Sequence, residues 1–178
     1  VAEAGGVHTA QGSWSARQGK FVPRRQLPVY ERQYFPEKLL GEDNLPDWRK
    51  AGTTISETDA LRTWTLDGKV LIASIQSKMH AISPDVMEGL MEAVDLAERE
   101  YDGMVIWSGD APFSVGADLQ ATMPAYVVAG IAAIEGVEHE LQNLMLRLRY
   151  AQVPVVSAIH GMALGGGCEL AVHSARRV

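Results

Sequence analysis

Residues 160–170 read His160-Gly161-Met162-Ala163-Leu164-Gly165-Gly166-Gly167-Cys168-Glu169-Leu170. They follow an apolar run, residues 154–159, which predicts a buried strand with a proline at its first position. The glycines predict a tight turn, and the residues from Gly167 to His173 predict a helix. Backbone N–H groups at the start of such a helix have no partner inside it and lie at the positive end of its dipole. This stretch therefore predicts a site where backbone donors face a ligand.

A second turn of the same kind comes earlier in the chain. Gly103 to Trp107 is a short apolar run that predicts a buried strand, Ser108 to Gly116 is expected to be a loop, and a short helix is expected from Ala117. Two such turns that face each other can point N–H donors at one oxygen atom, which is an oxyanion hole. Glu169, in the first turn of the later helix, is then placed to act as a general acid or base beside a bound carbonyl.

The sequence before the first turn, and the sequence between the two turns, alternate strand and helix patterns. Leu61 to Leu66 and Lys69 to Ile75 predict a hairpin, because Asp67-Gly68 supplies the positive φ angles of a type I′ turn. Ser83-Pro84 is expected to cap the next helix. Apolar residues at helical spacing predict buried faces on two helices: Met87, Leu90, Met91 and Val94, then Ile134, Val137, Leu141, Leu144, Met145 and Leu148. This alternation predicts an α/β layer fold with parallel strand pairing.

The first part of the chain, residues 1–57, has a different character. It holds four of the eight prolines, and its glycine-rich and polar stretches have little pattern. A short helix is expected between Tyr30 and Leu40. We interpret residues 1–57 as a connector or the tail of a preceding domain, and residues 58–178 as the first two-thirds of one domain. Because a strand is expected to start just before Val178, the chain is expected to be a fragment.

The composition excludes several classes of protein. Apolar residues make up 47% and charged residues 21% of the 178 residues, as in ordinary globular proteins. The net charge of −6 provides no basic surplus for nucleic acid. The single cysteine, Cys168, permits no intramolecular disulfide and indicates a reducing, cytoplasmic location. No apolar run suggests a membrane span, and no metal spacing, Gly-x-Ser-x-Gly elbow or Gly-x-Gly-x-x-Gly dinucleotide motif is present.

The remaining side chains that could be chemically active, a cysteine and two histidines, are more simply interpreted as structural than as catalytic. Cys168 is expected to be a small buried residue, because no base is placed by sequence to activate it as a nucleophile. His160 is expected to shape the glycine turn, and His139 to be a solvated side chain between two glutamates. Trp107 and the methionines are expected to belong to the core.

The two turns together resemble a known family. Phe113 to Leu119 and Gly161 to Leu170 look like the two signature segments of the crotonase (enoyl-CoA hydratase) superfamily, in the family's order and at about its separation. The resemblance implies a crotonase-like (ClpP/crotonase) spiral of ββα units, here truncated at its C-terminal end and preceded by an irregular N-terminal extension.

The same resemblance assigns roles to residues. It implies that Ala117 and Gly166 donate the two oxyanion-hole N–H groups and that Glu169 is one of two acid/base carboxylates, the other lying beyond Val178. Asp118, Leu119 and Gln120 are then expected along the acyl-CoA path, although many hydratases have lysine at the position of Gln120. Ala81 lies in Lys78 to Ala81, which is similar to the segment that touches the adenine or pantetheine, with His80 at a common asparagine position.

A wider resemblance suggests a longer parent. From Phe21 onward the chain is similar to long bacterial β-oxidation proteins in which an NAD-dependent 3-hydroxyacyl-CoA dehydrogenase region precedes a crotonase domain. Phe21 to Tyr30 looks like their junction, and Leu66 to Ser74 and Val105 to Trp107 look like the opening of their hydratase part. The resemblance implies no cofactor in this segment, acyl-CoA as substrate, NAD only in the dehydrogenase region, and an oligomeric full-length protein.

The expected function is hydration of 2-enoyl-CoA to 3-hydroxyacyl-CoA within a bifunctional fatty-acid oxidation protein. Two alternatives stay open. One is a Δ3,Δ2-enoyl-CoA isomerase, which shares the oxyanion hole but shifts a double bond. The other is a catalytically silent acyl-CoA-binding module. The residues around the second carboxylate would separate hydratase from isomerase.

Overall fold

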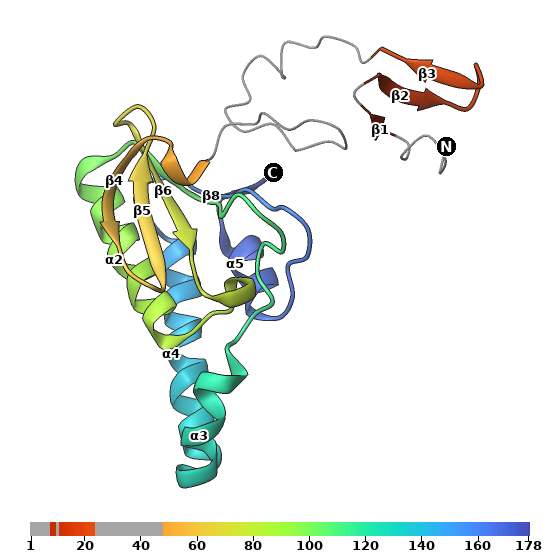
Figure 1. The fold of residues 1–178 in the computed structure, drawn as a ribbon. Helices are drawn as coiled ribbons and strands as arrows, with labels where there is room; N and C mark the ends of the chain where they lie inside the picture. The colour runs from red at the N-terminus through yellow and green to blue at the C-terminus, as the bar shows by residue number, and fades with distance from the viewer. Residues whose placement is uncertain (1–7, 10, 24–47) are drawn as a thin grey trace. The chain divides into compact units, whose positions relative to one another are not determined.

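A computed structural model of the protein describes residues 8, 9, 11–23 and 48–178, which fall into two compact units, Val1–Ala51 and Gly52–Val178 (Figure 1). The helix expected between Tyr30 and Leu40, and most of the junction from Phe21 to Tyr30, lie outside the described residues.

The first unit contains a small antiparallel sheet of β1 (His8–Thr9), β2 (Gly12–Ser15) and β3 (Lys20–Val22). Trp14 is paired with Phe21 across β2 and β3, and their rings meet edge to face with centroids 5.3 Å apart. The irregular structure expected here was wrong for these residues. Strands of two to four residues are too short to display the alternating pattern by which strands are recognised. The unit also includes the 3₁₀ turn η1 (Trp48–Lys50).

The second unit is built on a six-stranded sheet. Its strands follow one another in sequence order: β4 (Thr53–Glu57), β5 (Leu61–Thr65), β6 (Val70–Ile75), β7 (Gly103–Ile106), β8 (Val155–Ser157) and β9 (Arg176–Arg177). The β4–β5 and β5–β6 pairs are antiparallel, and the three later pairs are parallel. The predicted α/β fold with parallel pairing is confirmed.

Strand β4 begins the unit earlier than residue 58, where the sequence placed the start of the domain. Its residues Thr53–Glu57 pair with Arg62 to Thr65 of β5, although all five are exposed. A strand with neither face buried has no hydrophobic alternation, so only its hydrogen-bonded neighbour reveals it. Gly52, which starts the unit, has φ of +67°.

The β5–β6 hairpin is confirmed, but its turn is not type I′. Only Gly68 of the Asp67-Gly68 pair has a positive φ, at 76°. Side chains close the turn instead: Thr65 Oγ1 accepts from the Gly68 N–H and donates to the Val70 carbonyl, and Asp67 Oδ1 accepts from the Lys69 N–H. Because these side-chain hydrogen bonds satisfy the backbone, a longer connection replaces the two-residue turn.

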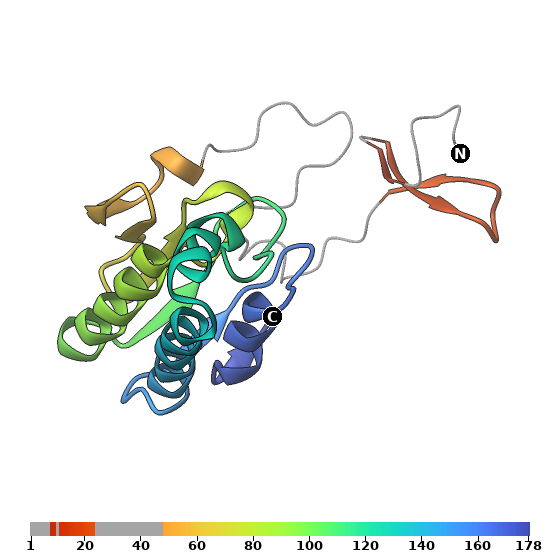
Figure 2. The ribbon, with the colours of Figure 1, turned by 90° about the horizontal axis from the view of Figure 1, so that it is seen from below.

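Helices cover one face of this sheet. The helices are α2 (Pro84–Glu100), α3 (Leu119–Ala129), α4 (Ile131–Arg149) and α5 (Gly166–His173), and η2 (Lys78–His80) is a single 3₁₀ turn. Helices α2 and α5 pack on the strands, and α4 lies between them (Figure 2). The predicted cap of α2 is confirmed, because the Ser83 side chain accepts from the Val86 N–H.

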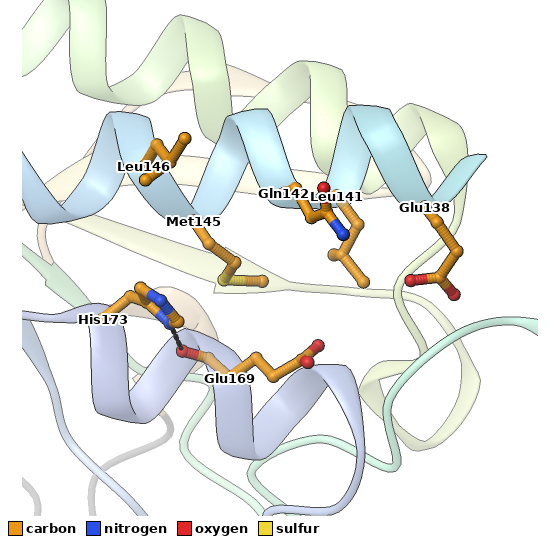
Figure 3. A pocket seen from close by; sticks show the side chains of 7 residues that line it. All are labelled: Glu138, Leu141, Gln142, Met145, Leu146, Glu169 and His173. Carbon is orange, nitrogen blue, oxygen red and sulfur yellow. Dashed lines mark hydrogen bonds between the residues drawn. The ribbon is translucent and has the colours of Figure 1, made fainter. Parts of the chain in front are cut away.

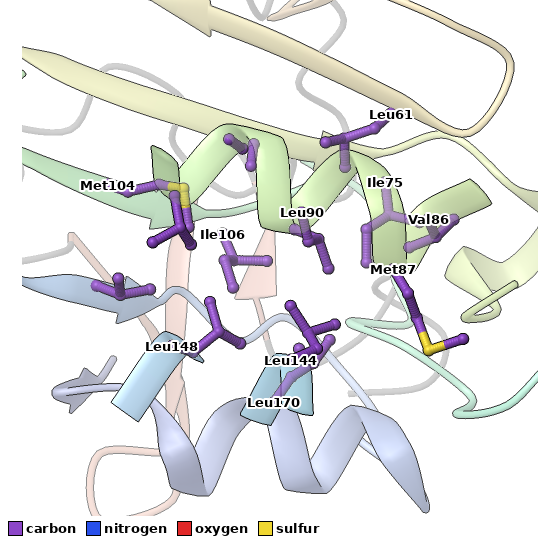
Figure 4. Close-up of a cluster of buried hydrophobic side chains, with 14 of the residues drawn as sticks. Leu61, Ile75, Val86, Met87, Leu90, Met104, Ile106, Leu144, Leu148 and Leu170 are labelled. Atoms are coloured by element: carbon purple, nitrogen blue, oxygen red, sulfur yellow. The ribbon is translucent and has the colours of Figure 1, made fainter. Parts of the chain in front are cut away.

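The core lies where these layers meet. Leu90 of α2, Ile106 of β7, Leu144 of α4 and Leu170 of α5 are all fully buried and converge in Figure 4. Each side chain removed from water in this way contributes about 2 kcal/mol to folding. The predicted buried faces of α2 and α4 are therefore largely confirmed. Met91 and Val137 are only partly buried against the core, and Ile134 is partly exposed outside it.

The expectation that the methionines are core residues holds for Met87, Met104 and Met145 only. Met79, Met123 and Met162 are each about half exposed, at 49%, 46% and 54%. They lie on turns or on α3, whose side chains are all at least partly exposed. Among the described residues, no helix is long and apolar enough to cross a membrane.

Candidate active site

The two glycine turns lie side by side and are joined by backbone hydrogen bonds. Ser114 and Ala163 form an isolated parallel bridge. The Ser114 N–H donates to the Met162 carbonyl at 3.2 Å, and the Leu164 N–H donates to the Ser114 carbonyl at 3.0 Å. The parallel sheet thus extends past the ends of β7 and β8, and it holds the two turns at a fixed register.

On its other side, the first turn is bonded to the segment before α2. The Ile82 N–H donates to the Gly116 carbonyl at 2.8 Å, and the Asp118 N–H donates to the Ile82 carbonyl at 2.9 Å. In this parallel bridge Ile82 bonds to the residues on either side of Ala117. The N–H and C=O of Ala117 itself therefore point away from Ile82.

On the side of Ala117 that faces away from Ile82 lies the start of α5. A β-carbon built on Gly166 would lie 3.8 Å from the Ala117 nitrogen, and one built on Gly116 would lie 3.0 Å from the Gly166 nitrogen. Gly166 is the first residue of α5, so its N–H has no partner within the helix. The structure brings together the two residues to which the family resemblance assigned the donor roles.

The third glycine of the triplet has a packing role. A β-carbon on Gly167 would lie 2.7 Å from both the Cβ and the carbonyl oxygen of Ser114. Side chains do not tolerate such distances, so only glycine lets α5 start this close to the first turn. Gly116, with φ of +89° and the Leu164 carbonyl 2.7 Å from its would-be Cβ, is required for both conformation and space.

A pocket of about 290 Å³ opens between α4 and α5 beside this point. Figure 3 shows its lining: Glu138, Leu141, Gln142, Met145 and Leu146 from α4, with Glu169 and His173 from α5. The Glu169 side chain extends into the pocket from the first turn of α5, while His173 Nδ1 lies 2.9 Å from the Glu169 carbonyl. Leu141 and Met145 are buried and form an apolar wall.

Sequence reasoning found Glu169 and missed most of the remaining lining. Glu138 and Gln142 were not singled out, and Leu141 and Met145 were assigned only to the core. The signal was present, because residues 138, 141, 142, 145 and 146 share one face of a helix at three- and four-residue spacing. Only the position of α5 shows that this face borders a pocket.

The expected acyl-CoA residues lie around the first turn. Asp118 caps α3, its Oδ1 accepting from the N–H groups of Gln120 and Ala121 at 2.9 and 3.1 Å. The helix expected from Ala117 therefore begins at Leu119, because Ala117 belongs to the bridge with Ile82. Leu119 and Gln120 are exposed at the start of α3, and Ala81 adjoins Ile82. Their contact with a ligand stays a prediction.

Two further expectations concern single residues. Cys168 was expected to be buried, and this was wrong: it is exposed on the first turn of α5, whose core-facing residues are Leu170 and Ala171. His139 is exposed as expected, and its Nδ1 contacts the Asn143 amide at 3.2 Å. Within the described part of the chain, no three His, Cys, Asp or Glu side chains are grouped to hold a metal ion.

Comparison with known proteins gives consistent matches. The sequence model described as enoyl-CoA hydratase/isomerase matches residues 69–175. A probable 3-hydroxyacyl-CoA dehydrogenase of Bacillus subtilis is 32% identical over 111 residues, 62% of this chain and 14% of that protein. A putative fatty acid oxidation complex trifunctional enzyme of Rickettsia felis is 36% identical over 107 residues, 56% of this chain and 14% of that protein.

Solved structures match about 70% of this chain. A putative enoyl-CoA hydratase from Streptomyces coelicolor has a TM-score of 0.61 at 22% identity, with 72% of this chain and 48% of that chain covered. An enoyl-CoA hydratase/carnithine racemase from Magnetospirillum magneticum has a TM-score of 0.60 at 21% identity, covering 68% and 46%. These likenesses confirm the predicted crotonase-like fold. The chain spans about half of these structures and 14% of the curated relatives.

Proposed function

Because the chain belongs to the enoyl-CoA hydratase/isomerase family, we propose that its site adds water to 2-enoyl-CoA thioesters and yields 3-hydroxyacyl-CoA. Membership of this family supports a crotonase-type reaction. Hydration, and the residues that perform it, are our proposal. The observation that carries it is the close packing of Gly116 and Ala117 against Gly166 at the start of α5, one turn from Glu169.

The two N–H groups bind the thioester oxygen. When water adds at C3, negative charge moves onto this oxygen and an enolate forms. Donors that are already oriented stabilise this charge without reorganising, and losing one typically costs about 3 kcal/mol in other oxyanion holes. The bridges from Ser114 to Ala163 and from Ile82 to Ala117 supply that rigidity.

Glu169 acts as an acid or base on the carbon atoms next to the bound carbonyl. It lies three residues after Gly166, and its side chain extends into the pocket bounded by Leu141 and Met145. A carboxylate in this position either activates the attacking water or exchanges the proton at C2. The apolar wall suits an acyl chain. The second carboxylate of the hydratase pair is expected beyond Val178.

The coenzyme A part binds across the first turn. Asp118, Leu119 and Gln120 follow Ala117 directly in the chain, and Ala81 precedes Ile82, the bridge partner of Ala117. We expect a thioester whose oxygen reaches Ala117 to pass close to them. Asp118 acts here through the cap of α3, because its Oδ1 already accepts two backbone N–H groups. Leu119 is 67% exposed and offers an apolar contact to the pantetheine.

The chain is proposed to be the hydratase segment of a bifunctional fatty-acid oxidation protein. Its curated relatives are described as a 3-hydroxyacyl-CoA dehydrogenase and a trifunctional enzyme. In such a protein NAD belongs to the dehydrogenase region, and this segment acts on acyl-CoA alone. We also propose that the full-length protein is an oligomer.

A Δ3,Δ2-enoyl-CoA isomerase is the second candidate. Such a reaction moves one proton between C2 and C4, which a single carboxylate can carry, and Glu169 extends into the pocket from α5. The third candidate, a silent acyl-CoA-binding module, keeps the two N–H donors without turnover. These candidates differ in what Glu169 does, and a substitution there separates them.

The test uses the full-length protein that contains this chain. Crotonyl-CoA and a 3-enoyl-CoA are each supplied to the wild type, to Glu169→Gln and to Glu140→Gln, an exposed carboxylate on α4 outside the pocket. Hydration should fall roughly 10²-fold or more in Glu169→Gln, as for loss of a general acid or base, and stay near wild type in Glu140→Gln. Conversion of the 3-enoyl-CoA alone would support the isomerase. Binding with no turnover of either thioester would support the silent module.

A further inference from the structure

Residues 77–82, which contain η2, are hydrogen-bonded to the loop that leads to Ala117. Met79 and His80 both have left-handed backbone conformations, with φ of 55° and 53°. This turn aims two carbonyl groups at the loop: the Val115 N–H donates to the Met79 carbonyl at 3.4 Å, and the Ser114 hydroxyl donates to the His80 carbonyl at 2.7 Å.

His80 adds a contact through its side chain. The residue is 8% exposed, and its Nδ1 forms a hydrogen bond with the Pro112 carbonyl. A carbonyl oxygen only accepts, so Nδ1 carries the hydrogen and donates it. The other ring nitrogen, Nε2, lies 4.0 Å from Asp110 Oδ1 on the same loop. The imidazole therefore holds the loop at Pro112, four residues before Gly116.

Ser114 connects His80 to Gly116, the residue before Ala117. Its side chain is fully buried, and its Oγ accepts from the Gly116 N–H at 3.1 Å while donating to the His80 carbonyl. His80 thus holds the loop at Pro112 through its ring, and at Gly116 through its backbone carbonyl and the Ser114 hydroxyl. The Ala117 N–H belongs to the next peptide, Gly116–Ala117, whose carbonyl accepts from the Ile82 N–H at 2.8 Å. Its direction therefore depends on Gly116, which Ser114 holds at its N–H and Ile82 holds at its carbonyl.

We propose that His80 is a positioning residue for the oxyanion hole: its imidazole fixes the loop of residues 112–116 so that the Ala117 N–H faces the same oxygen as the Gly166 N–H. This inference rests on the proposed oxyanion hole, and it holds for hydration and for isomerisation alike. His80 touches no reacting atom. A displacement of a donor by about 1 Å can cost up to 10²-fold in rate, so a residue outside the site can control it.

Two amide variants separate the donor from the rest of the ring. His80→Asn places its Nδ2 donor at the same number of bonds from the backbone as Nδ1, and asparagine tolerates the left-handed region. His80→Gln carries the same amide one bond further out, where it misses the Pro112 carbonyl. Both variants replace the imidazole ring by the same amide group, and they differ only in how far that amide lies from the backbone.

A third variant, His80→Gly, keeps the left-handed backbone and removes the donor altogether. Its control is Met79→Gly, which loosens the same turn and leaves the imidazole in place. Met79 has nearly the same φ, and its side chain is 49% exposed. Thermal unfolding of every variant shows whether it is folded. If the glycine variants do not fold, the comparison of His80→Asn with His80→Gln still tests the proposal.

The readout uses acetoacetyl-CoA as well as turnover. This thioester ionises to an enolate with its own ultraviolet absorbance, so the enolate fraction of the bound ligand reports the donors directly. In the full-length protein we expect His80→Gln and His80→Gly to lower that fraction and kcat by roughly 10-fold or more while KM stays within about twofold, since the lost stabilisation belongs to the charged state. His80→Asn should recover most of both, and Met79→Gly should lose far less than His80→Gly.

The outcomes distinguish this inference from the proposed reaction. If the wild type binds acetoacetyl-CoA as enolate but hydrates nothing, the hydratase proposal fails and the absorbance still tests His80. If all His80 variants keep the wild-type enolate fraction and kcat, His80 does not position the donor. The same conclusion follows if His80→Asn is as impaired as His80→Gln, or if the wild type forms no bound enolate.

Discussion

A β-carbon on Gly116 would lie 3.0 Å from the backbone nitrogen of Gly166, in a different strand–turn–helix unit. The two residues are fifty positions apart in the sequence. Gly116 lies in the first turn, and Gly166 is the first residue of the helix that follows the second. Their approach is what places Ala117 beside the first N–H of α5. The candidate site therefore depends on the absence of a β-carbon at Gly116 more than on any side chain.

Gly116→Ala should abolish turnover and destabilise the protein by about 2 kcal/mol. Its methyl group would meet the Leu164 carbonyl at 2.7 Å and the Gly166 nitrogen at 3.0 Å, at a φ of +89°. The matched control is Gly68→Ala, which has a φ of +76° and nothing within 4 Å of the new atom. The control should cost about 1 kcal/mol and leave activity intact. Urea unfolding and enoyl-CoA turnover measure both; equal losses in the two variants would contradict the crowding argument.

Gly167→Ala and Gly136→Ala should change stability in opposite directions. Both glycines are helical, but a methyl group at residue 167 would lie 2.7 Å from the Ser114 Cβ and carbonyl oxygen, while one at residue 136 meets nothing within 4 Å. We expect Gly167→Ala to lose about 1 to 3 kcal/mol of unfolding free energy and Gly136→Ala to gain about 0.5 to 1. Chemical denaturation decides this, and a stabilising Gly167→Ala would show that the packing of α5 on Ser114 is looser than described.

Glu98 should make stability fall in acid. Hydrogen bonds from Arg147, and then from the Gln152 N–H, lower the pKa of Glu98 from 4.5 to about 2. Since the folded pKa is the lower one, this stabilisation is complete above about pH 4.5 and disappears as the pH falls towards 2. Glu98→Gln should therefore be less stable than wild type at pH 7, by about 1 to 2 kcal/mol after allowance for solvent screening. The difference should shrink in acid.

The control for that measurement is Glu92→Gln, an exposed carboxylate on the same helix. Thermal unfolding curves from pH 2 to 7 give the comparison. A Glu98→Gln deficit that stays constant across this range would mean that the Glu98–Arg147 pair, which joins α2 to α4, does not have the described electrostatic role.

Leu144→Ala should cost about 3 kcal/mol, because this fully buried side chain joins α4 to α2 and α5. Leu146→Ala, two residues along, removes a side chain that is 50% exposed. It should cost less than about 1 kcal/mol. Denaturant midpoints at constant slope measure the difference, and comparable values would place the core elsewhere.

Local patterns in the sequence were enough to predict most elements of the second unit. Apolar residues at helical spacing predicted the buried faces of α2 and α4, and Ser83 predicted where α2 starts, because a cap is formed by neighbours in sequence. Strand β4 was missed, since all its residues are exposed. The type I′ turn was wrong because the Thr65 and Asp67 side chains bond the backbone differently.

By itself, the sequence determined that two glycine turns each open a helix after a buried strand, and that Glu169 follows the second. Their resemblance to a family supplied the roles. Only the tertiary structure decided that Gly116 and Gly166 are neighbours, that His80 and Ser114 hold the loop before Ala117, and that Glu138 and Leu141 share a pocket with Glu169. The physical reason is range: caps, turns and periodicity arise within a few residues, whereas a site between two turns depends on the register of parallel strands far apart in the chain.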